Sequence, residues 1–338
     1  MATIHDVAKL AKVSIATVSR VMSGADPVNP KTQQRVLEAM EKLNYRPNGL
    51  ARNLRSQKTN VIIALVPDIK NPFFSEVIRG IEDGARQAGF NVLIGSTDGD
   101  RDKTKEYMAL LDESRADGII LTTTQTDRAF LEEFAARSPV VLACEYLPGS
   151  DIPSVSIDNE SAARKITKHL LSLGHTRIAH IMGPSNVILC QARLNGYRQA
   201  LHQHGIMEDE LLIQEGDYSL DSGYLITRKL LSINRIPTAI FAANDEMAIG
   251  AMKAIRDFGL RVPHDISVVG FDDIHFSSYV SPALTTIQQP RYEIGQRSVN
   301  MLIKLIRSEP LDQSQVVLED TLVVRESSAA CQRAIQEG

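Results

Sequence analysis

Acids, amides and aromatic residues follow the apolar, strand-like runs of this sequence. They are Asp68 with Asn71 to Phe74, Thr97–Asp98, Cys144–Tyr146, Asp217–Tyr218, Asn244–Asp245 and Asp272–Asp273. Carboxylates accept hydrogen bonds from hydroxyl groups and aromatic rings stack on ring faces, whereas a phosphate needs glycine-rich loops or basic side chains. The set therefore favours a pocket for an uncharged, hydroxyl-rich ligand. For any single residue, a helix cap or a turn is an equally good interpretation.

Motifs for catalysis are missing from the sequence. It has no GxxxxGK[ST], HExxH or GxSxG motif, and no GxGxxG follows the first strand-like run. The three cysteines, Cys144, Cys190 and Cys331, form no CxxC pair. His202 and His204 are two residues apart, so a helix would point them in different directions. We therefore expect neither an enzyme, nor a cofactor, nor a metal site.

Charge is distributed unevenly over the 338 residues. Residues 1–60 carry 10 Lys and Arg against 4 Asp and Glu, while the remaining 278 residues carry 27 against 37. This asymmetry predicts a basic head for a polyanion on an acidic body. The hydrophobic share of 43% is ample for a packed core. Apolar runs such as Val61–Val66 are too short to span a bilayer, and no secretory signal is recognisable, so we expect a cytoplasmic protein without a membrane partner.

The first 46 residues predict three helices. Thr3 and Asp6 form a capping box, Ser14 caps a helix over Ile15–Met22, and Asn29–Pro30 begins the third. The apolar positions expected to face inward are Val7, Leu10 and Ala11 on the first helix and Val36, Leu37, Met40 and Leu43 on the third. Two short helices joined by a tight turn, with a third to close the core, is the helix-turn-helix plan.

Strand-like runs alternate with helix-length amphipathic segments from residue 61 onward. The runs are Val61–Val66, Phe90–Ile94, Gly118–Thr122, Val140–Cys144, Ile178–Gly183, Leu211–Glu215, Ala239–Ala243 and Ile266–Phe271. The helical segments include Glu76–Ala88, Ser161–Gly174, Ala192–Gly205, Ser219–Ser232 and Asp245–Gly259. Repeated βα units predict an α/β fold with doubly wound parallel sheets. Its length predicts two lobes, with a break near residues 155–159.

Several stretches, in this order, resemble the LacI/GalR family of bacterial repressors. They are Met1–Lys9 with Val13–Val21, Asn44–Leu54, Asn71–Phe74, Gly174–His175, Pro237–Phe241, Gly270–Asp273 and Leu284–Ile287. The resemblance implies a periplasmic-binding-protein-like body with two lobes joined by three crossing segments. The expected domains are a helix-turn-helix head at 1–47, a hinge helix and linker at 48–60, and a body at 61–338. Within the body we expect one lobe at about 61–157 plus 289–318 and another at about 158–288 plus 319–338.

The family's function would be ligand-controlled repression by a homodimer on palindromic double-stranded operator DNA. The second helix exposes Ile15, Ala16 and Arg20, which can contact thymine methyl groups and guanine. Hydroxyl groups placed to bind phosphate are those of Thr3, Ser14, Thr17 and Ser19. In the hinge, we expect Asn48, Arg52 and Arg55 to contact DNA, and a segment this short to fold only on DNA. Two copies of Leu54 would then enter the minor groove at the dyad.

Two other classes share parts of this pattern. A solute-binding transport protein has the same body fold, but it would carry an export signal and no basic helix-turn-helix head. A Rossmann-type enzyme would carry the phosphate-binding fingerprint that is missing here. Salt-dependent binding to DNA separates a repressor from both.

Residues 66–82 and 183–194 most resemble the family's cytidine-responsive branch. This resemblance implies a second transcription regulator as a partner and an effector pocket formed by Phe73, Phe74, Cys144, Glu145, Val187, Leu189, Arg193, Tyr218, Asn244 and Asp272. Arg193 and Asp272 can bond one sugar from opposite lobes, while Val187 and Leu189 offer no hydrogen bond to a purine edge. We therefore expect a nucleoside such as cytidine. A sugar (ribose or a hexose) is the alternative, and a purine base fits less well.

Overall fold

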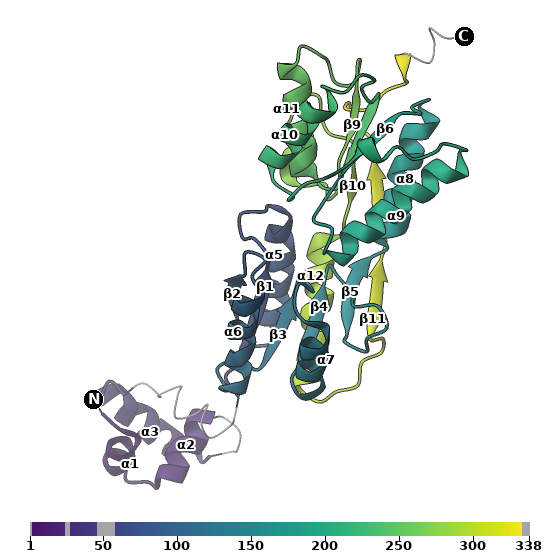
Figure 1. The fold of residues 1–338 in the computed structure, drawn as a ribbon. Helices are drawn as coiled ribbons and strands as arrows, with labels where there is room; N and C mark the ends of the chain where they lie inside the picture. Colours follow the sequence, from purple (N-terminus) through teal and green to yellow (C-terminus); the bar gives the residue numbers. More distant parts are fainter. Residues whose placement is uncertain (1, 24–27, 46–57, 333–338) are drawn as a thin grey trace. The chain divides into compact units, whose positions relative to one another are not determined.

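The computed structural model describes residues 2–23, 28–45 and 58–332. It divides the chain into two compact units, Met1–Thr59 and Asn60–Gly338, here called the head and the body (Figure 1). Each is described by itself. No helix among the described residues is long and apolar enough to cross a membrane.

The head consists of the helices α1 (Ile4–Ala11), α2 (Ile15–Ser23) and α3 (Pro30–Lys42). All three predicted caps are present: Thr3 and Asp6 form the capping box, the Ser14 hydroxyl accepts a hydrogen bond from the Thr17 N–H, and the Asn29 side chain accepts one from the Lys31 N–H. A helix leaves its first backbone N–H groups without partners inside the helix, and the capping side chains accept hydrogen bonds from them. The capping residues therefore set where these helices begin.

The core of the head is built from small and branched side chains. Its buried members are Val7, Ala8, Ala11, Val18, Val36 and Ala39. Leu10 and Leu37 were expected to face inward, but each is 48% exposed. Each lies one residue from a buried position of its helix, Ala11 and Val36, and one residue turns a helix by about 100°, which carries the side chain to the outside. The prediction of the inner face was therefore wrong at these two positions.

Two parallel sheets form the body. The first has the strand order β11-β5-β4-β3-β1-β2, with bounds β1 (Val61–Val66), β2 (Asn91–Ser96), β3 (Gly118–Leu121), β4 (Val140–Ala143), β5 (Ser154–Ile157) and β11 (Gln315–Leu318). The second has the order β7-β6-β8-β9, with bounds β6 (Ile178–Met182), β7 (Ile213–Glu215), β8 (Ala239–Ala242) and β9 (Ser267–Val269). The strands β1, β3 and β4 are buried, as their continuous apolar runs require.

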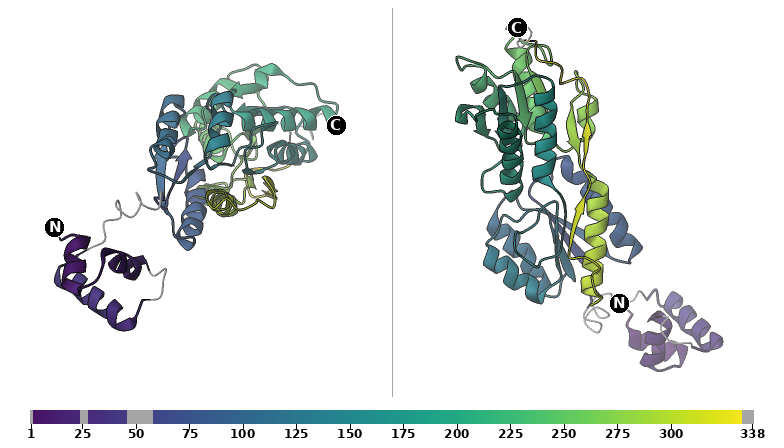
Figure 2. Two further views of the ribbon diagram at one scale, coloured as in Figure 1. Left: turned by 90° about the horizontal axis from the view of Figure 1, so that it is seen from below. Right: turned by 90° about the vertical axis from the view of Figure 1, so that its right-hand side faces the viewer.

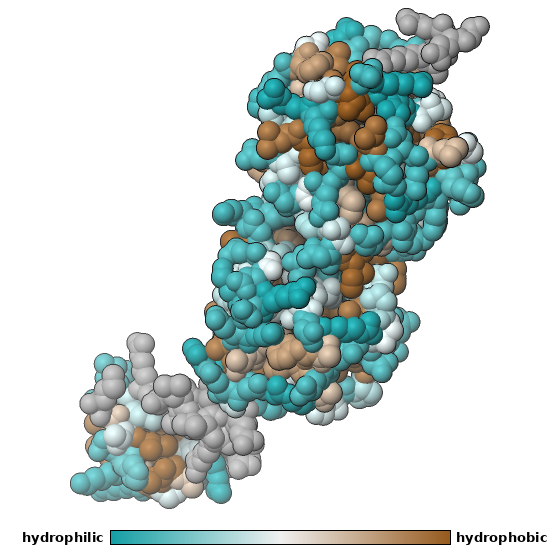
Figure 3. Space-filling model, in the orientation of Figure 1, coloured by the Kyte–Doolittle hydropathy of each residue, from teal (hydrophilic) through white to brown (hydrophobic). Residues whose placement is uncertain are grey.

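Helices cover both sheets. The first sheet carries α5 (Phe73–Gln87), α6 (Arg101–Asp112), α7 (Arg128–Arg137) and α12 (Arg291–Ile306). The second carries α8 (Asn159–Ser172), α9 (Ile188–Gln203), α10 (Leu220–Leu230) and α11 (Asp245–Asp257). We call each sheet with its helices the first and the second lobe. In the space-filling view most of the visible surface is hydrophilic, with smaller apolar patches between (Figure 3).

The helices α5 and α12 touch backbone to backbone. A Cβ atom added at Gly295 would lie 2.1 Å from the Val77 carbonyl oxygen, and one at Gly80 would lie 2.1 Å from the Tyr292 carbonyl oxygen. No side chain fits at that distance, so glycine is required at both positions. The close approach fixes α12, which comes from a late part of the sequence, against the helix that follows β1.

Within residues 58–332 the chain passes between the lobes three times. The passages follow β5, precede α12 and follow β11, and the latter two contain β10 (Thr286–Gln288) and β12 (Thr321–Val323). These two strands pair antiparallel, and Figure 2 shows them side by side along one edge of the body. The residues after β12 return to the second lobe, where the Ser327 carbonyl accepts a hydrogen bond from the Val268 N–H.

Candidate functional site

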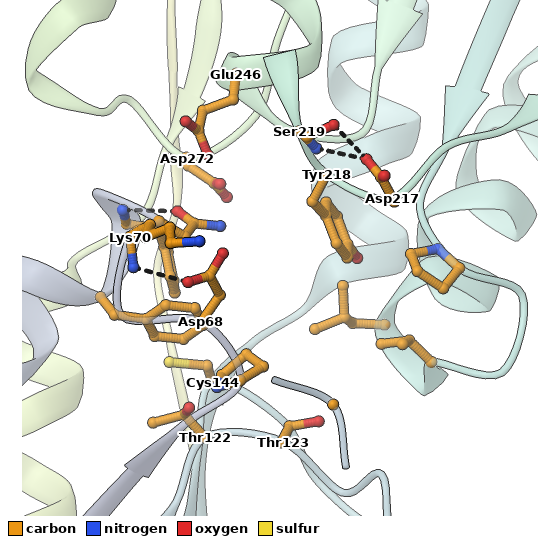
Figure 4. Close-up of a pocket in the computed structure, with 18 of the residues that line it drawn as sticks. Asp68, Lys70, Thr122, Thr123, Cys144, Asp217, Tyr218, Ser219, Glu246 and Asp272 are labelled. Carbon is orange, nitrogen blue, oxygen red and sulfur yellow. Dashed lines mark hydrogen bonds between the residues drawn. The ribbon is translucent and has the colours of Figure 1, made fainter. Parts of the chain in front are cut away.

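A cavity of about 870 Å³ lies between the two lobes of the body. It is lined by residues that follow β1, β2, β3 and β4 of the first lobe and β6, β7, β8 and β9 of the second. Both sheets are parallel, so the carboxyl ends of their strands meet at one edge, where ligands bind in open α/β folds. Figure 4 shows side chains from both lobes pointing into this space.

Nine of the ten residues predicted for the effector pocket line this cavity: Phe73, Phe74, Cys144, Glu145, Val187, Leu189, Arg193, Tyr218 and Asp272. Asn244 differs from the prediction. Its side chain caps α11 by accepting from the Met247 N–H at 2.9 Å and donates to the Tyr218 carbonyl, also at 2.9 Å. Both of its polar groups are therefore occupied, and Asn244 supports the loop that carries Tyr218.

Arg193 is held in a fixed position at the inner end of the cavity. Its Nε donates to the Asn159 side chain at 2.9 Å, and one terminal nitrogen donates to the Ala243 carbonyl. The guanidinium plane lies over the Phe271 ring at 3.7 Å. These two hydrogen bonds use two of five N–H donors, so others remain for a ligand.

Asp272 faces this guanidinium. One of its oxygens lies 3.8 Å from an Arg193 terminal nitrogen and accepts a hydrogen bond from Gln289 at 2.8 Å. Both Arg193 and Asp272 are almost fully buried. At 3.8 Å the two charges attract but do not share a hydrogen bond. The pair therefore presents a donor and an acceptor side by side, as a sugar with neighbouring hydroxyl groups requires.

Burial shifts the protonation of the acids in the cavity. It raises the pKa of Asp272 to about 6, against the opposing effects of Arg193 and Gln289. It also raises the pKa of Glu246 to about 7, and there Asp272 and Asp68 add to the rise as like charges. Burial likewise raises the pKa of Glu145, although Thr124 donates two hydrogen bonds to it at 2.7 Å.

The two thiols near the cavity are not reactive. Burial raises the pKa of Cys144 far above its usual range and that of Cys190 to about 11. The Cys190 sulfur also lies 2.6 Å from the Tyr218 hydroxyl. Because the thiolate is the nucleophile, the raised pKa values keep both groups as neutral thiols near pH 7, and Cys144 lines the cavity in that form.

Apolar side chains form one part of the cavity wall. The rings of Phe73 and Phe74 meet edge to face, with centroids 5.0 Å apart and an angle of 85°. Both belong to the start of α5, where the Asn71 side chain accepts the Phe73 N–H at 2.9 Å. Val187 and Leu189 contribute from the start of α9. This wall suits an apolar ring better than a polar edge.

The cavity is also lined by four residues of the predicted strand-end set, Asp68, Asn71, Asp98 and Asp217. Further polar residues that were not predicted line it as well: Lys70, Thr122, Thr123, Gln125, Ser219, Asp221, Glu246 and Gln289. Most follow strands, so the rule that pointed to Asp68 and Asp217 would also have found the threonines after β3. Glu246 follows the noted pair Asn244–Asp245 by one residue. Gln289 carries no such signal, because it lies on a crossing segment that the sequence did not mark as strand.

The head presents the predicted α2 residues on its surface. Ile15, Ala16 and Arg20 are exposed, whereas Val18 is fully buried. The Ser14 hydroxyl lies 2.9 Å from that of Thr17 and accepts the Thr17 N–H at 3.1 Å. A shallow hollow beside α2 is lined by Val13, Ser14, Thr17, Arg20, Val28, Asn29, Thr32 and Arg35.

Three polar residues of this hollow were not predicted: Asn29, Thr32 and Arg35. They come from the start of α3, where an N-cap and exposed polar side chains would have been the available signal. Among the predicted phosphate contacts, Ser19 is half-buried, and the Thr3 hydroxyl already donates to Asp6 at 2.8 Å. Asn48, Arg52, Leu54 and Arg55 lie outside the described residues.

Comparison with known proteins matches both units of the chain. Residues 3–48 match the family described as bacterial regulatory proteins, lacI family. Residues 59–325 match the family described as periplasmic binding proteins and sugar binding domain of LacI family. The first match covers the head and the second covers the sheets and the cavity of the body.

Individual relatives extend over nearly the whole chain. The HTH-type transcriptional repressor CytR of Escherichia coli strain K12 is 39% identical over 330 residues, 97% of each chain. The ribose operon repressor of Halalkalibacterium halodurans is 38% identical over 330 residues, also 97% of each chain. A crystal structure of the lac repressor dimer bound to operator and the anti-inducer ONPF has a TM-score of 0.87 at 33% identity, covering 97% of this chain and 99% of that one.

These relatives act in gene regulation, and none is named as an enzyme. The chain belongs to the LacI family of bacterial regulatory proteins: it is a DNA-binding transcriptional repressor whose body binds a small-molecule effector.

Proposed function

We propose that the effector of this repressor is a nucleoside such as cytidine. The observation that carries the proposal is the buried pair of Arg193 and Asp272, 3.8 Å apart, in a cavity that also has an apolar patch formed by Phe73, Phe74, Val187 and Leu189. The pair can bind neighbouring ribose hydroxyl groups, the guanidinium as donor and the carboxylate as acceptor. The base would then lie against Phe73 and Phe74, whose rings offer a face and an edge.

The residues at the start of α9 favour a nucleoside over a free purine base. Val187 and Leu189 line the cavity and have no polar side-chain atom. A purine bound by hydrogen bonds to its edges would leave those groups unpaired there, which costs about 1–3 kcal/mol per group. A nucleoside can place its ribose hydroxyl groups on Arg193 and Asp272. Fewer of its hydrogen bonds then depend on Val187 and Leu189.

A simple sugar is the second candidate. The Arg193–Asp272 pair suits any ring with neighbouring hydroxyl groups, and Asp68, Asp217 and Glu246 offer further acceptors. The relative named ribose operon repressor supports ribose in particular. The two candidates differ in their contacts with the apolar side chains of the cavity. A nucleoside buries its base against them, whereas a sugar makes no such contact.

On DNA, the protein would act as a homodimer on a palindromic operator, because one short recognition helix reads too few bases for specificity. Ile15, Ala16 and Arg20 of α2 would read bases, and two copies of Leu54 would enter the minor groove at the centre of the site. The operator-bound lac repressor dimer supports this arrangement. By resemblance to the cytidine-responsive branch, a second transcription regulator would be a further partner.

Calorimetry on the full chain tests the effector. Cytidine, adenosine, uridine, ribose and hypoxanthine are titrated into the natural sequence and into Asp272→Asn. We expect cytidine to bind at least tenfold more tightly than ribose and to lose most of its affinity in the variant. Asp151→Asn is the control, because it removes an exposed carboxylate that does not line the cavity. Equal affinity for ribose and cytidine would refute the nucleoside, since the base would contribute nothing.

A further inference from the structure

The charges of the cavity are strongly unbalanced. Among the described residues that line it, seven carry carboxylates: Asp68, Asp98, Glu145, Asp217, Asp221, Glu246 and Asp272. Two are cationic, Lys70 and Arg193. Figure 4 shows Asp68, Glu246 and Asp272 on the same side of the cavity, opposite Tyr218 and Asp217. Any ligand therefore meets a negative potential on entry.

The two cations do not balance these acids, because Arg193 is already engaged within the protein and Lys70 is a single exposed lysine. Arg193 is almost fully buried, makes hydrogen bonds to Asn159 and Ala243, and has the carboxylate of Asp272 at 3.8 Å. An anion at its remaining donors would therefore lie beside a second negative charge. Lys70 is exposed at the rim, within the electrostatic reach of Asp98.

Two of the helices that begin at the cavity carry acidic side chains at their N-termini, which offset the positive end of the helix dipole. A helix N-terminus attracts anions, and α10 and α11 both start here. However, Asp221 lies in the first turn of α10 and Glu246 in the first turn of α11, and both line the cavity. These carboxylates therefore offset the positive N-terminal ends of the two helix dipoles, which would otherwise attract a phosphate.

Glu246 is the acid of the cavity whose carboxylate is most available to interact with a ligand, because the other described residues of the fold do not bind it. It is half-buried, and its side chain makes no hydrogen bond or ion pair with the rest of the described chain. Asp272, Glu145 and Asp217, in contrast, accept hydrogen bonds from Gln289, Thr124 and Ser219. Burial raises the pKa of Glu246, and the nearby negative charges of Asp272 and Asp68 add to that rise. The same two charges would repel an anion bound beside Glu246.

We propose that Glu246, together with Asp68, is a specificity residue that excludes phosphate esters, so that the repressor responds to the unphosphorylated effector and not to its phosphorylated form. The inference rests on the cavity being the effector site, and it holds for a nucleoside and for a sugar alike. Specificity of this kind comes from a repulsive element in the site, and like charges brought together out of water are costly. A phosphorylated sugar held by Arg193 and Asp272 would bring its phosphate into a cavity that is also lined by these carboxylates.

Two matched pairs of ligands test the proposal on the full chain: cytidine with cytidine 5′-monophosphate, and ribose with ribose 5-phosphate. Calorimetry measures each affinity in the natural sequence, in Glu246→Gln and in the double variant Asp68→Asn, Glu246→Gln. For whichever parent binds, we expect its phosphate ester to bind roughly 100-fold more weakly, and Glu246→Gln to reduce that ratio by about tenfold. The ratio should also fall as salt is raised from 0.05 to 0.5 M, because exposed charges are screened.

Glu133→Gln is the control for net charge, because Glu133 is an exposed acid of α7 that does not line the cavity. In this variant the ratio of the affinity for the parent ligand to the affinity for its phosphate ester should equal the ratio in the natural sequence. The proposal is overturned if the phosphate ester binds as tightly as its parent, or if the ratio stays unchanged in both cavity variants. Binding of ribose but not of cytidine would instead refute the nucleoside, while the ribose pair still tests the exclusion of phosphate.

Discussion

At the scale of single residues, the carboxyl group of Asp272 makes effector binding depend on pH. Its pKa is raised to about 6 by burial, so it is ionised at pH 7.5 and takes up a proton as the pH falls through 6. A protonated carboxyl has lost an acceptor for a ligand hydroxyl. We expect the affinity to fall below pH 6 by up to about tenfold per pH unit, as measured by calorimetry between pH 5 and 8.

The fold itself responds in the opposite direction. The pKa of Asp272 rises from 3.8 in an ordinary environment to about 6 in the folded protein, so the folded state binds this proton more tightly. The contribution of Asp272 to the free energy of unfolding therefore decreases as the pH rises from about 4 to about 6. Acid does not weaken the fold through this group.

The control for the affinity measurement is Glu246→Gln, because Glu246, with a pKa of about 7, also titrates in this pH range. A pH dependence that persists in this variant does not come from Glu246. An affinity that is constant from pH 7.5 to 5 would contradict the role of Asp272.

At the scale of elements, α2 and α3 of the head should contribute differently to DNA binding. Arg20 lies on the exposed face of α2 and Arg35 near the start of α3, and both line the same hollow. Arg20→Ala should cost about 1–3 kcal/mol on the operator and relax the preference at one base position. Arg35→Ala should weaken all sequences alike, because a phosphate contact reads no sequence. Binding to a set of single-base operator variants measures both. A uniform loss with Arg20→Ala would make Arg20 a phosphate contact.

The contact between α5 and α12 leads to a stability prediction. Gly295→Ala would place a Cβ atom 2.1 Å from the Val77 carbonyl oxygen, so the two helices must separate. We expect the free energy of unfolding to fall by about 1–3 kcal/mol or more, as measured by urea denaturation. Asn300→Ala on the exposed face of the same helix is the control and should be neutral or slightly stabilising. Equal stability of Gly295→Ala and the natural sequence would show that the helices can move apart without cost.

At the scale of the whole molecule, a ligand held by both lobes should be coupled to operator binding. Arg193 comes from α9 of the second lobe and Phe73 from α5 of the first, so a bound effector favours one arrangement of the lobes. Coupling is reciprocal: the factor by which effector changes operator affinity must equal the factor by which operator changes effector affinity. We expect a factor of about 5 to 150, measured in both directions. A factor of one would mean that occupancy of the cavity is not transmitted.

Local chemistry determined much of this molecule before any tertiary contact is considered. The Thr3–Asp6 capping box, the Asn29 cap and the continuous apolar run of β1 (Val61–Val66) lie where the sequence predicts them. Each depends on neighbours within a few residues. Pocket residues that directly follow strands, such as Asp217 and Asp272, could be predicted because a parallel sheet brings the residues after its strands to one edge. Val187, Leu189 and Arg193 were expected only from the resemblance to the LacI/GalR family.

Only the tertiary structure decided the parts that depend on distant partners. The strands β5, β10, β11 and β12 are short and partly polar, and they exist through pairs such as Gln315 with Ser154 and Thr286 with Val323. Gln289 reaches the cavity because a crossing segment places it beside Asp272. Asn244 does not line the cavity, and its side chain is hydrogen-bonded to the Tyr218 carbonyl and to the Met247 N–H at the start of α11. A local pattern records how a residue suits its own helix or strand, whereas these positions depend on contacts between segments far apart in the chain.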